Sequence, residues 1–135
     1  MVQPVHIIPV EDDTPELGGT RARIRSLIRA GHLVDGPRSC GKTQALVELL
    51  HELVYEGKEI LIIVPTHREV GWFESRFRYL YPGTKPPRVR VGDPSLLSRG
   101  ARTPNSVYVD GFFRCDPGFM DACWQHPSIV VKGIA

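Results

Sequence analysis

The chain has 135 residues, of which 41% are hydrophobic and 24% are charged, and its formal net charge is +2. These values are typical of one globular domain, and they exclude a polycation and a low-complexity chain. No apolar run approaches the roughly 18 residues of a transmembrane helix, and we expect no signal peptide because the N-terminal segment lacks a basic region and a long apolar core.

The first part of the chain predicts an N-terminal arm or an edge strand over residues 1–19, followed by a single domain over residues 20–135. The arm contains the short apolar run Val5–Val10, which a proline interrupts and an acidic link follows. Apolar residues then recur at helical spacing in residues 20–31, and Gly31 suits the end of a helix.

Two strands and two helices are expected next. Residues 32–35 predict a short strand that leads into a loop containing two glycines. Apolar residues recur every three or four positions from Ala45 to Val54, which predicts a helix. The run Ile60–Val64 is typical of a strand buried on both faces, as in a parallel sheet. A second amphipathic helix is predicted from Val70 to Leu80.

The last third of the chain predicts three short strands and two short helices. The strands are expected at Val89–Val91, Val107–Asp110 and Ile129–Val131, and the helices within residues 93–106 and from Pro117 to Trp124. Strands and helices that alternate in this way predict an α/β fold with a mostly parallel central sheet flanked by helices.

Residues 36–43, GPRSCGKT, fit the pattern of a phosphate-binding loop between a strand and a helix, which specifies the fold as the three-layer P-loop NTPase type. The glycines let backbone N–H groups point at the phosphates, and the following helix adds its dipole. Lys42 would reach the outer phosphates, and the Thr43 hydroxyl would bind Mg²⁺. We therefore expect a nucleoside triphosphate to contact Gly36, Pro37, Arg38, Ser39, Cys40, Gly41, Lys42, Thr43 and Gln44.

An acidic residue, Asp110, ends the apolar run VYVDG about seventy residues after the loop. Mg²⁺ prefers hard oxygen ligands, and phosphate-loop enzymes usually hold it with the loop hydroxyl and an Asp at the end of a strand. Thr43 and Asp110 are therefore the predicted metal ligands. The alternative is that Asp110 caps the turn that follows.

Hydrolysis also requires a group that orients or deprotonates water. Many ATPases of this kind have a Glu directly after the strand Asp, whereas this chain has Gly111. Asp116 and Asp121 lie nearby in the sequence, but neither has the expected spacing. The sequence therefore predicts nucleotide binding with slow turnover or none.

Three cysteines, Cys40, Cys115 and Cys123, cannot all pair within one chain. Free thiols favour a reducing, cytoplasmic compartment. A zinc site formed by Cys115, Cys123 and His126 is a weak alternative, because it lacks a fourth ligand and the usual paired spacing.

Three segments together resemble the ATPase domain of phage large terminase subunits and, more distantly, DNA helicases. The loop DGPRSCGKT resembles the terminase loop, in which an arginine occupies the third position of the motif. The segment IIVPTHREVGWFESRF is similar to the strand and helix that follow the loop in both families. SRGARTPNSVYVDG is similar to the terminase stretch in which Arg-Gly precedes the strand with the Mg²⁺ Asp. The resemblance covers roughly residues 20–135.

This resemblance implies that the nucleotide is ATP and that Lys42, Asp110 and Arg38 are the catalytic residues. Asp110 would hold Mg²⁺ through water. Arg38 would act as an arginine finger in cis on the γ-phosphate, with a salt bridge or a solvated side chain as the alternative. IVVKGIA resembles the strand that couples hydrolysis to movement, so Lys132 would sense phosphate, or else be a surface lysine. A phage-encoded chain would act in the host cytoplasm.

The resemblance also implies contact with DNA. Nine Lys or Arg residues lie between positions 68 and 114, and Arg makes forked contacts to phosphate. The alternative is an ordinary solvated basic surface. The candidate DNA face consists of Arg68, Arg76, Arg78, Arg88, Arg90, Arg99 and Arg102.

The nuclease domain of terminases and the second motor lobe of helicases have no counterpart in these 135 residues. We therefore expect a minimal ATP-binding module that works with a partner protein or as a homo-oligomer. Two other functions stay open: a small nucleotide or metabolite kinase, and a non-hydrolysing ATP-binding interaction protein. No base-reading motif distinguishes ATP from GTP.

Overall fold

The computed structural model describes residues 7–10, 17–37, 41–94, 96, 106–126 and 129–135. Most of the short helix and turn predicted within residues 93–106 therefore lies outside the described residues. The helices and strands in chain order are β1 (Ile7–Pro9), α1 (Leu17–Arg29), β2 (Leu33–Asp35), α2 (Lys42–Tyr55), β3 (Leu61–Val64), α3 (His67–Leu80), β4 (Arg88–Val91), β5 (Ser106–Asp110), the 3₁₀ helix η2 (Phe112–Arg114), α5 (Pro117–Gln125) and β6 (Val130–Ile134).

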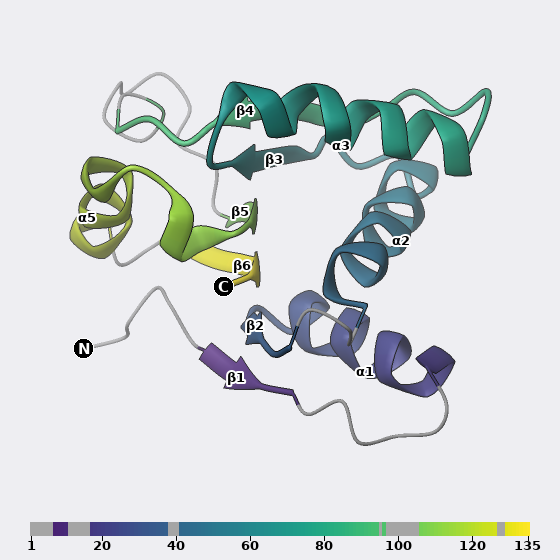
Figure 1. The fold of residues 1–135 in the computed structure, drawn as a ribbon, viewed down its shortest axis with the longest axis horizontal. Coiled ribbons are helices and arrows are strands. Elements are labelled where there is room, and N and C mark those ends of the chain that lie inside the picture. The colour runs from purple at the N-terminus through teal and green to yellow at the C-terminus, as the bar shows by residue number, and fades with distance from the viewer. Residues whose placement is uncertain (1–6, 11–16, 38–40, 95, 97–105, 127–128) are drawn as a thin grey trace.

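These strands form one sheet in the order β1-β2-β6-β5-β3-β4, and every neighbouring pair is parallel. The prediction of an α/β fold with a mostly parallel central sheet flanked by helices is therefore confirmed. The last strand, β6, lies between β2 and β5 (Figure 1), so the C-terminal strand is in the middle of the sheet. The first described strand, β1, lies at one edge and pairs with β2.

Helices cover both faces of the sheet and make three layers. One hydrophobic cluster joins α1, α2 and α3 to one face, through residues such as Val34, Ile62 and Tyr108. A second cluster joins η2 and α5 to the other face, through Leu33 and Val109 among others. Side chains of successive strand residues point to opposite faces, which explains why neighbours such as Leu33 and Val34 belong to different clusters.

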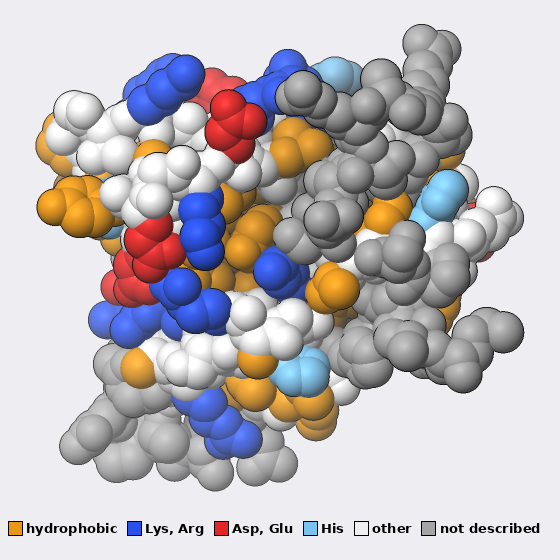
Figure 2. Space-filling model, turned by 180° about the vertical axis from the view of Figure 1, so that it is seen from behind, with side chains coloured by type: hydrophobic (Ala, Val, Ile, Leu, Met, Phe, Trp, Pro, Cys, Tyr) orange, Lys and Arg blue, Asp and Glu red, His pale blue; other side chains and the backbone are white. Residues whose placement is uncertain are grey.

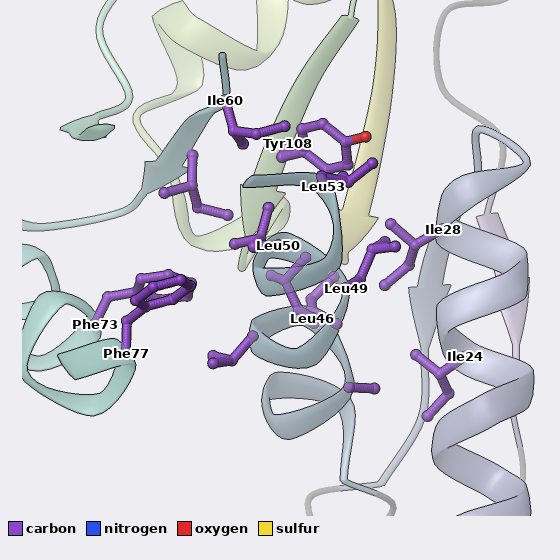
Figure 3. Packing of buried hydrophobic residues seen from close by; sticks show 14 of the residues in the cluster. Ile24, Ile28, Leu46, Leu49, Leu50, Leu53, Ile60, Phe73, Phe77 and Tyr108 are labelled. Carbon is purple, nitrogen blue, oxygen red and sulfur yellow. The ribbon is translucent and has the colours of Figure 1, made fainter. Parts of the chain in front are cut away.

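The helix α2 lies at the centre of the larger cluster. Its buried residues surround most of the helix, and they are Ala45, Leu46, Val47, Leu49, Leu50 and Leu53. Figure 3 shows Ile24 and Ile28 of α1 pointing toward α2 from one side, and Phe73 and Phe77 of α3 from the other. The helix α2 is therefore packed between α1, α3 and the sheet.

In the described part of the chain, no helix is long and apolar enough to cross a membrane.

Candidate functional site

The candidate site lies at the carboxyl edge of the sheet. Because the strands are parallel, β2, β3 and β5 all end at this edge. The loop that starts at Gly36 follows β2, Asp110 ends β5, and α3 begins shortly after β3. Ligands of open α/β sheets bind in the crevice outside the carboxyl ends of the strands. The fold therefore gathers the predicted loop and the predicted acidic residue at the edge where ligands bind.

The loop is held at both ends by its own residues. The Asp35 carboxylate accepts a hydrogen bond of 2.9 Å from the Gly36 N–H, and the Lys42 ammonium donates to the Gly36 carbonyl. Gly41 has φ 80° and ψ 27° directly before α2, a left-handed conformation that favours glycine. Lys42 and Thr43 are thus the first two residues of α2, where free N–H groups and the helix dipole favour an anion.

Three of the predicted loop residues, Arg38, Ser39 and Cys40, lie outside the described residues. The described loop residues lie between the end of β2 and the first turn of α2. Gly36, Gly41, Lys42, Thr43 and Gln44 are half-buried, and Pro37 is exposed. The role of Arg38 as a finger in cis therefore stays a prediction from the resemblance.

Asp110 is buried, with only 9% of its surface exposed. Burial raises the pKa of its carboxyl from 3.8 to about 6, because the charged form loses its hydration. The Arg114 and Lys42 cations lower this pKa, and the Glu69 carboxylate raises it. A carboxylate that is buried without a full counter-charge favours a bound cation, so its chemistry fits Mg²⁺.

One strand, β6, separates the strand of the loop from the strand of Asp110. Two inter-strand spacings amount to about 10 Å, which leaves room for a hydrated metal ion and a phosphate between them. Lys42 nevertheless lies near enough to lower the pKa of Asp110. Lys42 and Asp110 therefore lie at the same edge of the sheet, within electrostatic reach of each other.

Gly111 stands where the resemblance leads us to expect a glutamate, and its conformation disfavours one. Its φ of 91° lies in the left-handed region, where side chains with a Cβ are strained. A Cβ at this position would lie 2.5 Å from a terminal guanidinium nitrogen of Arg114. The Arg114 guanidinium thus occupies the space in which a glutamate side chain would begin.

A different carboxylate, Glu69 in the first turn of α3, lies at this edge. Arg114 donates to Glu69 Oε1 at 2.7 Å, and the Thr66 hydroxyl donates to Oε2 at 3.0 Å. Glu69 was not among the site residues predicted from the sequence, although a signal was present. Thr66 and Glu69 have the Thr-x-x-Glu spacing of a capping box, which places a glutamate at the start of a helix.

The candidate DNA-binding arginines do not share one surface. Arg68, Arg76 and Arg78 lie exposed on α3, whereas Arg88 and Arg90 lie exposed on the edge strand β4. Arg99 and Arg102 lie outside the described residues. On the side of the molecule seen in Figure 2, basic side chains lie beside acidic ones, so that side carries no uniformly basic surface.

Lys132 does not lie at the loop. Its ammonium is 4.9 Å from the centre of the Tyr108 ring, and burial together with the charges of Lys58 and Arg29 lowers its pKa. Arg29 is the last residue of α1, and Lys58 follows the end of α2. Both residues therefore lie near helix ends that are remote from the loop. This neighbourhood corresponds to a partly buried lysine, not to a phosphate sensor.

The zinc alternative has little support in the described residues. No group of three or more His, Cys, Asp or Glu that could hold a metal ion is present among them. Cys115 and Cys123 are free and buried in the second cluster. Burial raises their pKa values to about 11 and about 12, so both stay protonated thiols near neutral pH.

Comparison of the chain with protein-family models, curated proteins and solved structures found no significant match.

Proposed function

We propose that this chain is a minimal ATP- and Mg²⁺-binding module that resembles the ATPase domain of terminases and acts with DNA. The observation that carries the proposal is the pairing of two features at one sheet edge. Lys42 and Thr43 begin a helix directly after a glycine loop, and the buried carboxylate of Asp110 faces them within electrostatic reach. This combination matches the needs of a triphosphate and its metal ion.

In the proposed complex, the loop N–H groups and the Lys42 ammonium bind the phosphates, and the Thr43 hydroxyl and Asp110 hold the metal ion. Bound Mg²⁺ would neutralise charge that develops on the phosphate oxygens. Lys42 would give up its hydrogen bond to the Gly36 carbonyl in order to reach the phosphates. The Gln44 side chain, which follows Thr43, accepts a 3.2 Å hydrogen bond from Arg76 and so connects the nucleotide helix to α3.

A thermal melt with nucleotide tests the proposal. Ligand at about 100 times its Kd adds about 2.7 kcal/mol to the free energy of unfolding, which raises the midpoint measurably. We expect the midpoint to rise with ATP and Mg²⁺ in the wild type and not to rise in Lys42→Ala. In Asp110→Asn, the rise caused by ATP should no longer depend on Mg²⁺. Lys58→Ala, an exposed lysine beyond the other end of α2, is the matched control. A wild-type melt that neither ATP nor GTP shifts would overturn the proposal.

The DNA part of the proposal is supported by the outer face of α3, which we define as Arg68, Trp72, Arg76 and Tyr79. These residues are exposed, recur at three- and four-residue steps, and lie on a different side of the helix from the buried Phe73 and Phe77. Trp72 is 51% and Tyr79 is 78% exposed. Exposed aromatic rings interleaved with arginines are typical of surfaces that stack bases and bind the backbone of single-stranded nucleic acid.

Binding of a labelled single-stranded oligonucleotide, measured by fluorescence anisotropy, tests this surface. We expect affinity to fall steeply with salt and Trp72→Ala to weaken binding about tenfold or more, because one stacked base contributes about 1–3 kcal/mol. Tyr55→Ala is the matched control, since Tyr55 is an aromatic residue on α2 that is 86% exposed. Equal affinities for the two variants, or preference for duplex DNA, would contradict a stacking surface on α3.

A further inference from the structure

We propose that Glu69 orients the attacking water during ATP hydrolysis, in place of the glutamate that position 111 lacks, and that Arg114 positions it. The inference rests on the ATP and Mg²⁺ site proposed above. It departs from the expectation from the sequence that turnover is slow or absent because Gly111 stands in place of a glutamate.

The sheet order brings Glu69 to the site. β3 pairs with β5 in the register Ile63 to Val109, so the residues that follow these two strands are neighbours at the carboxyl edge. Glu69 therefore approaches Asp110 from β3, while the loop approaches from the other side through β6. The charge of Glu69 acts on Asp110, as does that of Lys42. Glu69 and Lys42 thus both lie close enough to Asp110 for their charges to act on its carboxyl.

Both carboxylate oxygens of Glu69 are held by partners outside the sheet. The Arg114 guanidinium binds Oε1 at 2.7 Å and the Thr66 hydroxyl binds Oε2 at 3.0 Å. These contacts fix the carboxylate while each oxygen keeps a further lone pair for water. Phosphoryl transfer has a loose transition state, so its catalysis depends on position more than on basicity. The role of Glu69 therefore depends on where its carboxylate holds the water.

The reaction balances with ATP and water alone. The water oxygen forms a bond to the γ-phosphorus while the bond from that phosphorus to the bridging oxygen breaks, and ADP leaves with the electron pair. One proton of the water stays on the released phosphate, and the other passes through the Glu69 carboxylate to solvent.

The glycine at position 111 is part of the same arrangement. The Arg114 guanidinium lies against Gly111, with a nitrogen 2.5 Å from the point that a Cβ would occupy, and it reaches Glu69 from there. A side chain at position 111 would require the Arg114 guanidinium to shift. Gly111 therefore leaves space for the guanidinium in the position from which it contacts Glu69.

Steady-state phosphate release and the ATP-induced thermal shift, measured together, test the role of Glu69. We expect Glu69→Gln to lower the rate of release about 100-fold or more, within the range of general acid–base catalysis, with ATP affinity changed less than about threefold. Glu74→Gln is the matched control, because Glu74 lies on the same helix and pairs with Arg78 instead. It should leave both quantities unchanged in the absence of DNA.

A second set of variants tests Arg114 as a positioning residue. Arg114→Ala should lower kcat about tenfold without raising KM, Arg114→Lys should recover part of the loss, and Arg114→Ala should cause no further loss in the Glu69→Gln background. A merely structural ion pair would instead lower the stability of each single variant, with little further loss in the double variant, and would leave kcat unchanged. Melts without nucleotide show whether each variant is folded.

The outcomes separate this inference from the proposed function. A wild-type protein that binds ATP and Mg²⁺ but releases no phosphate above background would overturn the role of Glu69 and leave the binding proposal standing. Equal rates for wild type and Glu69→Gln would do the same. A wild-type protein that binds no nucleotide would overturn both, and the thermal shift alone would reveal it.

Discussion

Among the described residues, Asp110 is the one charged side chain that is buried. Its carboxyl has a pKa of about 6 in the folded chain, against 3.8 ordinarily. A raised pKa means that the carboxyl binds its proton more tightly in the folded state than in the unfolded chain. The stability that Asp110 contributes is thus fully present below about pH 4 and is lost as the pH rises through 6.

We predict that Asp110→Asn removes this pH dependence. Between pH 4 and pH 8, without nucleotide or metal ion, the wild type should lose about 3 kcal/mol of unfolding free energy relative to the variant, since one pKa unit corresponds to 1.36 kcal/mol. Urea unfolding at several pH values measures the difference. Asp121→Asn, an exposed carboxylate on α5, is the control. A constant difference between wild type and Asp110→Asn across this range would contradict the prediction.

The helices α1 and α2 are joined by a ladder of ion pairs between three arginines and three glutamates. Its contacts include Arg25 to Glu48 at 2.9 Å and Arg29 to Glu52 at 3.0 Å, and Arg21 and Glu56 extend it at the two ends. These arginines are engaged with α2, so they do not add to a DNA-binding surface. Half-exposed pairs of this kind contribute modestly one by one and more as a network.

We predict a coupling free energy of about 0.5–1 kcal/mol between Arg25 and Glu48 in a double-mutant cycle with glutamine at both positions. The coupling should shrink in 1 M salt, because the Debye length falls to about 3 Å. The exposed pair Arg78 and Glu74, whose charged atoms are 4.0 Å apart, should show a smaller coupling. Equal coupling in both pairs would mean that the ladder acts as independent surface contacts.

At the scale of elements, the sequence predicted most of what the structure contains. The apolar periodicity of α2 and the apolar run of β3 were sufficient to predict these two elements, because a buried helix or strand leaves a pattern of apolar residues in its own sequence. The contact between Glu69 and Arg114 was not predictable in this way. It depends on β3 lying beside β5, and pairing between distant strands leaves no trace in either segment alone.

At the scale of the whole molecule, the sheet lies between two hydrophobic clusters, and its strands contribute side chains to both. The smaller cluster contains Cys115 and Cys123, both buried. The sequence predicted free thiols from their odd number, but it could not say that these two belong to the core. That follows from the packing of α5 against β5 and β6, which is a property of the assembled fold.

We predict that these thiols report global unfolding. In a Cys40→Ser background, which removes the loop cysteine, native protein should react with a thiol reagent at pH 8 only at the rate of unfolding. Their raised pKa values, about 11 and about 12, keep the reactive thiolate scarce at this pH. ATP and Mg²⁺ should slow the labelling further. Fast labelling of native protein would show that the α5 side opens independently of the sheet.

The backbone at Gly111 also constrains how this site could change over evolutionary time. A lineage that acquired glutamate at position 111 by one substitution would place a side chain at a φ of 91° and would require Arg114 to shift. The strain lies in the backbone, which the exposed and flexible arginine cannot relieve. Homologues of this chain should therefore keep glycine at position 111.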